Sequence, residues 1–229
     1  MKASKSIISF FAILKNPKMV KFSTISALSV TISCIILGYI IAQLDPDGYN
    51  MFTNYLSDMG SINHTPFPYF PVIKNLFSSI LLIPTLLYME NLLAPLPQNE
   101  KKMQDFSRTR LRLGSFGFFW MSIGLIGMFG LGVFTEDISI SIHMICTFLE
   151  FVGLAFGGIF FGLIIVFYPT IFPKLLGIYM TFVPTLLCTI FFSISFQPIF
   201  EWVLTFSILA YMILGGLIVI KHINKEIAS

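Results

Sequence analysis

Long apolar runs alternate with short polar segments along the whole chain, and this pattern predicts its secondary structure. Each apolar run is about 20 residues long, the length that a helix needs to cross the hydrocarbon core of a bilayer. The residue-by-residue alternation of a membrane β-barrel is absent. Because backbone in lipid must satisfy its own hydrogen bonds, we predict six transmembrane helices. They cover residues 22–43, 71–93, 113–133, 140–168, 175–194 and 200–220.

Composition agrees with a membrane protein built only of helices. Hydrophobic residues make up 56% of the 229 residues and charged residues only 11%, too few to cover the surface of a soluble domain. The predicted fold class is therefore all-α, an integral membrane bundle without a separate soluble domain. Residues 1–21 form a basic N-terminal segment, residues 22–220 the six-helix domain and residues 221–229 a tail.

The basic residues predict how the bundle lies in the membrane. Except for Lys74, every Lys and Arg falls in the N-terminal segment, the 94–112 loop, the loop at Lys174 or the C-terminal tail. With six crossings these segments share one side, which the positive-inside rule makes cytoplasmic. Both termini are then expected to be cytoplasmic, in the cell membrane. The net charge of +3 thus reflects topology and not nucleic-acid binding, and membrane lipids are the expected partners.

The first residues predict a surface helix and not a signal peptide. The apolar stretch at 7–14 is short and runs into the polar stretch at 15–18, with no small-residue cleavage site. An interfacial helix with its lysines among the lipid headgroups fits this pattern.

Glycine spacing predicts where the helices pack most closely. Gly124, Gly127 and Gly130 recur every three residues in the third span, and Gly153 and Gly157 lie four apart in the fourth. Small residues at such spacing bring helix backbones together in lipid.

Prolines and cysteines also fall inside the predicted spans. Pro84 and Pro184 predict kinks in the second and fifth helices. Cys34, Cys146 and Cys188 all lie in membrane segments, so we expect buried thiols and no disulfide framework.

Polar residues gather on the predicted outer side, where they indicate a pocket. Asp58 and His64 belong to the loop between the first two spans, and Asn75 to the start of the second. His143 starts the fourth span, and Glu150 lies two helical turns, or about 10 Å, deeper. Helical periodicity places positions 136, 143 and 150 on one face. The pocket candidates are Ser57, Asp58, His64, Asn75, Glu136, His143 and Glu150.

Most of these residues also have a structural explanation. Thr135 followed by Glu136 and Asp137 is typical of a helix start, in which an N-cap precedes acids that complement the helix dipole. Glu150 is harder to explain in this way. A carboxylate at that depth costs on the order of 3 kcal/mol to charge unless it meets a partner or a cavity.

The Ser-Asp pair of the first loop has its own structural explanation. Ser57 and Asp58 suit a turn, and Gly60 would supply a left-handed conformation there.

The histidines and carboxylates also suggest a metal-dependent alternative. Asp58, His64 and His143 would hold a divalent ion such as zinc, and Glu136 would act as general base in a membrane-embedded lipid hydrolase. However, the sequence has no HxxxH, HExxH or CxxC motif. A third hypothesis is a scaffold protein whose polar layer only closes the bundle.

Several of these residues form motifs that resemble a known family. Leu56–Gly60 reads LSDMG, Asn75 enters the second span, and Phe134–Asp137 reads FTED and precedes His143. The pattern resembles the six-pass prokaryotic membrane family called domain of unknown function 998, which is similar to the DRAM, Frag and Sfk membrane proteins. That family has no established reaction, and the links of its wider relatives to lipid remodelling imply a lipid-facing role.

Two positions depart from the family pattern. Lys74 stands where the family has an aromatic residue, which would change the charge of the site, and Thr135 stands where it has a proline.

The leading hypothesis is a membrane protein with an outward-facing polar pocket for a lipid headgroup or another small polar ligand.

Overall fold

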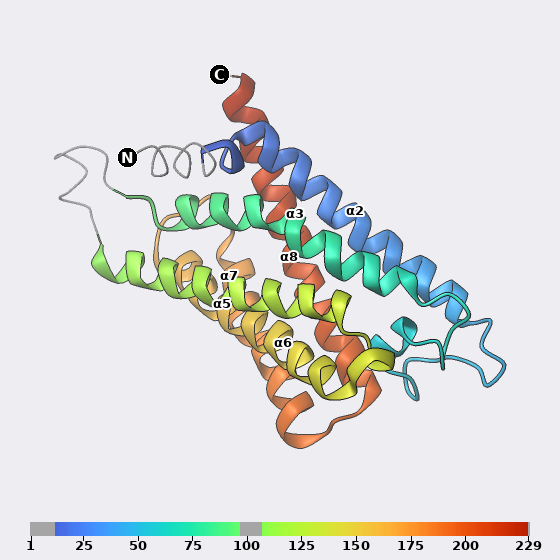
Figure 1. Cartoon of the computed structure of the whole chain (residues 1–229). Coiled ribbons are helices and arrows are strands. Elements are labelled where there is room, and N and C mark those ends of the chain that lie inside the picture. Colours follow the sequence, from blue (N-terminus) through green and yellow to red (C-terminus); the bar gives the residue numbers. More distant parts are fainter. Residues whose placement is uncertain (1–11, 97–106, 229) are drawn as a thin grey trace, which may run out of the picture.

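The described part of the chain is built of six long helices and has no β-strand (Figure 1). The computed structural model describes residues 12–96 and 107–228. The helices are α2 (Pro17–Ala42), α3 (Tyr69–Leu93), α5 (Arg108–Val133), α6 (Glu136–Phe167), α7 (Lys174–Thr189) with its π-helical continuation η2 (Ile190–Ile194), and α8 (Pro198–Ala228). Each is long and apolar enough to cross a membrane, with α7 and η2 taken together. The chain is a polytopic membrane protein, and the predicted all-α six-helix bundle is confirmed.

The helix ends differ from the predicted spans where polar residues continue a helix. α2 begins at Pro17, because the Asn16 side chain caps it by accepting a hydrogen bond from the Lys18 backbone N–H at 3.0 Å. The predicted interfacial helix at 7–14 and basic loop at 94–112 lie partly outside the described residues.

The helices pack in a closed ring that follows the order of the chain. Each contacts the next, and α8 closes the ring against α2. The start of α2 and the end of α8 lie at the same end of the bundle (Figure 1). There the Lys21 ammonium donates to the Asn224 side chain at 2.8 Å. The opposite end, where α3, α6 and α8 begin, carries the first loop.

Glycines let α5 and α6 approach almost backbone to backbone, as their spacing predicts. A β-carbon on Gly153 would overlap the backbone of Gly124, and one on Gly127 would overlap the backbone of Glu150. The next face of α6 uses Gly162 in the same way against α7. This contact fixes α6, and therefore the polar residues at its start.

The backbone is also irregular at positions where the sequence gives no signal. Pro84 and Pro184 lie inside α3 and α7 as predicted, but the non-helical residue within α6 is Ser139, with φ −164° and ψ 104°. The expected left-handed Gly60 is wrong: the positive φ among the described residues belongs to Gly48. Gly60 instead ends a short 3-10 turn, η1 (Ser57–Gly60), whose φ angles are negative.

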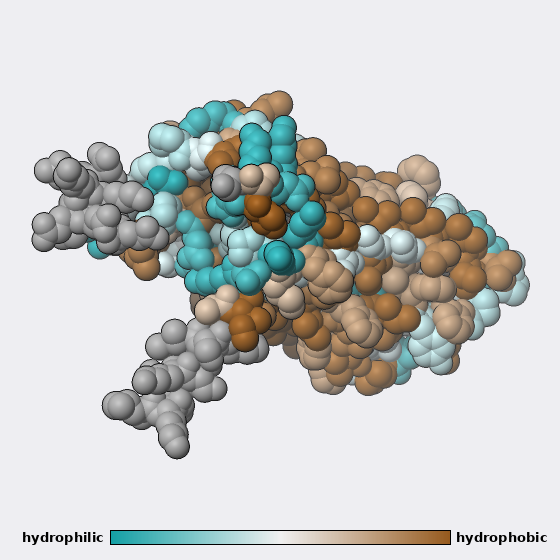
Figure 2. All heavy atoms as spheres, turned by 90° about the horizontal axis from the view of Figure 1, so that it is seen from above, coloured by the Kyte–Doolittle hydropathy of each residue, from teal (hydrophilic) through white to brown (hydrophobic). Residues whose placement is uncertain are grey.

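The surface of the bundle is apolar along its flanks. Figure 2 shows hydrophilic side chains gathered near the ends of the chain and hydrophobic ones along the helices. Large exposed apolar residues occur on all six helices and include Phe22, Phe77, Phe116, Ile145, Phe182 and Leu217. Such a surface suits contact with lipid. The three cysteines are buried and free, as expected.

Candidate functional site

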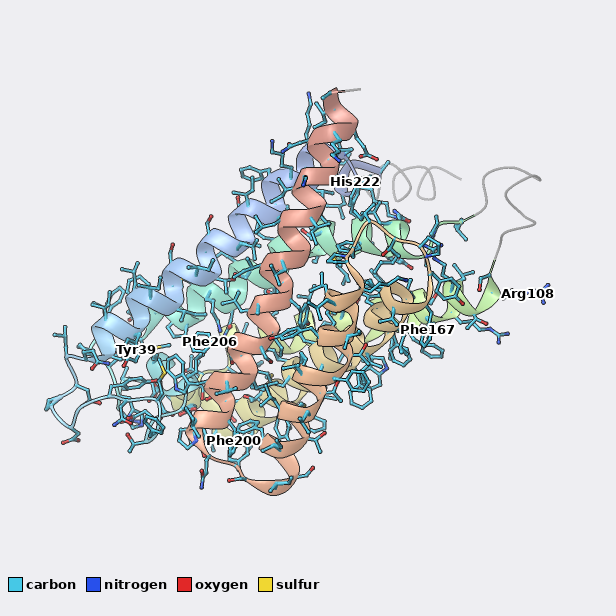
Figure 3. All side chains as sticks on the ribbon, turned by 180° about the vertical axis from the view of Figure 1, so that it is seen from behind. Tyr39, Arg108, Phe167, Phe200, Phe206 and His222 are labelled. Carbon is cyan, nitrogen blue, oxygen red and sulfur yellow. The ribbon has the colours of Figure 1, made fainter. Side chains whose placement is uncertain are left out.

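The first loop folds over the end of the bundle and is held there by α8. One oxygen of Glu201 accepts hydrogen bonds from the backbone N–H groups of Leu56 at 2.7 Å and Ser57 at 3.5 Å. The neighbouring Trp202 indole donates to the Asn54 carbonyl at 3.0 Å. Leu56 and Trp202 also belong to a buried apolar cluster that joins the loop to α8. In Figure 3, Tyr39 and Phe200 mark this end of the bundle.

A second acid ties the loop to α6. Asp137 accepts hydrogen bonds from the Ser61 hydroxyl at 2.6 Å and from the Ile62 backbone N–H at 3.0 Å. Asp58 closes the turn before them, since it accepts a hydrogen bond from the Tyr55 backbone N–H at 2.8 Å. The Ser-Asp turn of the loop is thus a folded structure whose backbone donors are capped by carboxylates.

The start of α6 directs one acid and one histidine toward each other. Thr135 takes an extended conformation before the helix but makes no side-chain cap. The His143 Nδ1 is 2.9 Å from the Phe134 carbonyl oxygen, so this nitrogen carries the ring hydrogen, and Nε2 of the neutral ring is an acceptor. Nε2 lies 3.5 Å from Glu136 Oε1, within ion-pair range but without a hydrogen bond.

Three buried side-chain atoms here have no hydrogen-bond partner among the described residues: His143 Nε2, Asn75 Oδ1 and Thr205 Oγ1. His143 is 5% exposed and Asn75 is 7% exposed, and neither His143 Nε2 nor Asn75 Oδ1 makes a hydrogen bond. Lys74 is also buried, at 5% exposed. Its ammonium lies within electrostatic range of Glu150 and Glu201.

These side chains surround two neighbouring cavities. The smaller has a volume of about 30 Å³, room for a water or two, and its polar lining includes Lys74, Asn75, Glu150 and Thr205. The larger has a volume of about 330 Å³. Four residues line both cavities: Ser57, Glu136, His143 and Glu201.

All seven residues singled out from the sequence lie on these two cavities. Ser57, Glu136 and His143 line both; Asp58 and His64 line only the larger one; Asn75 and Glu150 line only the smaller one. The break at Ser139 means that Glu136 meets His143 across a kink, and not along one regular helix face as the periodicity predicts.

Sequence reasoning missed Glu201 and the buried state of Lys74. A signal for Glu201 was present, because it is the only acidic residue between positions 151 and 225 and it opens the last span. Its partners come from the first loop, which no local pattern indicates.

The hypothesis of a metal centre gains no support from the geometry. Asp58, His64 and His143 line one cavity, yet the described ranges contain no group of three or more His, Cys, Asp or Glu side chains placed to hold a metal ion. The metal-dependent hydrolase therefore lacks a ligand set among these residues.

Burial changes the acidity of the loop carboxylate. Burial, together with the nearby Glu136 carboxylate, raises the pKa of Asp58 from 3.8 to about 6, although the Tyr55 N–H and His64 act in the opposite direction. Folded Asp58 thus keeps its proton to a higher pH than unfolded Asp58. Its contribution to stability is complete below pH 3.8 and is lost as the pH rises to about 6.

Thermal unfolding in detergent at several pH values tests this shift. We expect the melting temperature of the wild type to fall, relative to that of Asp58→Asn, as the pH rises from 3.8 to about 6, and then to run parallel. Other titrating groups are common to both proteins and cancel in the difference. Curves parallel over the whole range would contradict the shift.

Comparison of the chain with protein-family models, with curated proteins and with solved structures found no match. The resemblance to domain of unknown function 998 stays a prediction.

Proposed function

We propose that this membrane protein binds a small polar ligand in the two cavities beneath the first loop, on the outer face of the cell membrane. The observation that carries the proposal is the pair of buried acceptors without partners, His143 Nε2 and Asn75 Oδ1. A buried polar atom left unpaired costs about 1–3 kcal/mol. A ligand that donates hydrogen bonds to these atoms would recover that free energy.

A purely structural role for the polar layer is less favoured, because only some of its polar side chains hold the loop. Asp137 accepts hydrogen bonds from the loop through both of its oxygens, and Glu201 through one. His143 and Asn75 hold nothing through the atoms that face the cavity. A layer that only closed the bundle would be expected to pair these groups as well.

The outward orientation is supported by charge. Basic residues of the described chain, other than Lys74, lie toward the end of the bundle where α2 begins and α8 ends, whereas Asp58, Glu136, Asp137 and Glu201 lie at the other end. The positive-inside rule then assigns the cavities to the outer side.

Native mass spectrometry of the protein released from membranes by mild detergent tests the proposal. We expect the wild type to carry a bound molecule that Asn75→Ala and His143→Ala lose while remaining folded. Asn91→Ala, near the far end of the same helix, is the matched control and should retain it. Equal occupancy in all four proteins, or loss of folding in both site variants, would indicate a structural layer instead.

A further inference from the structure

The larger cavity is lined by carboxylates that keep free acceptor oxygens. Asp58, Glu136 and Glu201 all face it, and no Lys or Arg of the described ranges lines it. One oxygen of Asp58 and one of Glu201 accept no hydrogen bond from the described residues. A group with several hydrogen-bond donors and a positive charge suits such a lining.

The histidine of the cavity favours the same kind of group. Because His143 Nδ1 donates to Phe134, Nε2 of the neutral ring presents a lone pair 3.5 Å from the Glu136 oxygen. Two acceptors that face each other repel unless a donor lies between them. A ligand group that donates hydrogen bonds to both atoms would remove this repulsion.

Aromatic rings complete the lining. Tyr55, Phe191 and Phe196 border the same cavity. The rings of Phe191 and Phe196 stack with centroids 4.5 Å apart, and those of Tyr55 and Phe196 lie 5.6 Å apart. Carboxylates combined with aromatic faces recognise organic ammonium groups, through ion pairing and cation–π attraction. Aromatic rings have no such role in a site for a hard metal ion.

The cavity is too small for a whole lipid but has an apolar side. Its volume of about 330 Å³ is near the lower limit for small-molecule pockets, which is roughly 300 Å³. Ile140 and Met144 of α6 line it and are 57% and 37% exposed on the flank of the bundle. One turn deeper, the rings of Phe148 on α6 and Phe192 on η2 contact each other, with their centroids 5.2 Å apart.

The backbone is irregular on both sides of this apolar edge. α6 breaks at Ser139, and η2 is π-helical from Ile190 to Ile194. π-Helical turns occur frequently at functional sites.

Resting on the proposed function, we infer that the ligand is a membrane lipid whose headgroup carries an ammonium group. The ammonium lies between the three carboxylates and the aromatic rings. It donates hydrogen bonds to His143 Nε2 and to Glu136. The acyl chains leave over Ile140 and Met144, between α6 and η2, into the surrounding bilayer. Residues of the first loop line the cavity on its other side, so the lipid is expected to enter from the membrane.

Lipid titration followed by native mass spectrometry tests the headgroup. Phosphatidylethanolamine should bind at least about tenfold more tightly than phosphatidylglycerol with the same acyl chains, because only the former has an ammonium group. Glu136→Gln should remove most of this preference. Phe196→Leu, which keeps an apolar side chain without a ring, should weaken it as well. Equal affinity for the two lipids in the wild type would overturn the inference.

A second titration tests the path of the chains. Free ethanolamine should bind at least about tenfold more weakly than phosphatidylethanolamine. Met144→Trp should weaken lipid binding more than it weakens ethanolamine binding, because the larger side chain obstructs the apolar edge over which the chains leave. Ile145→Trp is the control, since Ile145 is 59% exposed on the same helix and does not line the cavity.

The outcomes separate this inference from the proposed function. If ethanolamine binds as tightly as the lipid, or if Met144→Trp binds the lipid like the wild type, the chain path is wrong, while a polar-ligand site stands. If neither lipid nor ethanolamine binds but the wild type still carries a molecule that Asn75→Ala loses, only the ammonium lipid is excluded. Unchanged occupancy in Asn75→Ala and His143→Ala would exclude the ligand site itself.

Discussion

Gly153→Ala is expected to destabilise the protein by about 3 kcal/mol or more. The added methyl would overlap the backbone of Gly124 and the carbonyl oxygen of Trp120. No rotamer change relieves a clash between a β-carbon and a neighbouring backbone, so α5 and α6 would have to separate. Thermal unfolding in detergent, followed by the fluorescence of the two tryptophans, measures the loss.

Gly215→Ala is the matched control for this substitution. Gly215 also lies within a transmembrane helix, but a β-carbon added there meets no atom within 4 Å. Alanine is preferred to glycine inside a helix by about 0.5–1 kcal/mol, so this variant should be as stable as the wild type or slightly more stable. Similar melting temperatures for the two variants would show that the close α5–α6 contact does not govern stability.

Glu201→Ala is expected to release the first loop from the bundle. It removes the acceptor of the Leu56 and Ser57 backbone N–H groups, and leaving a buried donor without a partner costs about 1–3 kcal/mol. Hydrogen exchange of a peptide covering residues 50–62 should accelerate by at least about tenfold. Because the cavity loses its cover and one of its carboxylates, ligand occupancy should fall as well.

Glu201→Gln distinguishes the loop anchor from the charge. Glutamine keeps an oxygen that accepts the Leu56 N–H, so the loop should stay protected while binding of a cationic ligand weakens. Unchanged exchange in Glu201→Ala would mean that the Trp202 contacts alone, to Asn54 and the surrounding apolar cluster, hold the loop.

The acids at this end of the bundle thus divide into two groups that look alike in the sequence. Asp137 and Glu201 accept backbone hydrogen bonds from the loop. Glu136 has only the long approach to His143. Asp58 caps Tyr55 with one oxygen, and both Asp58 and Glu201 also face the larger cavity.

The helix start at Thr135 shows why the division could not be predicted. The sequence there fits an N-cap followed by acids that complement the dipole, which would give Glu136 and Asp137 the same role. In the structure Asp137 reaches Ser61, 76 residues earlier in the chain, while Glu136 turns toward His143. The break at Ser139 lies between these two acids and His143, and no sequence signal identifies that break.

The six spans, the all-α class and the close glycine contacts followed from the sequence by itself. They depend on properties that add up along a helix: the length of an apolar run and the spacing of small residues on one face. The gathering of polar residues at one end followed for the same reason, once the crossings were counted.

Only the tertiary structure decided which of those polar groups have partners. Glu201 binds the N–H of Leu56 across 145 residues of sequence, and Lys74 is buried near acids from two other helices. A hydrogen bond requires two groups to meet within about 3 Å. That condition depends on how whole helices pack around each other, which the local pattern of residues does not contain.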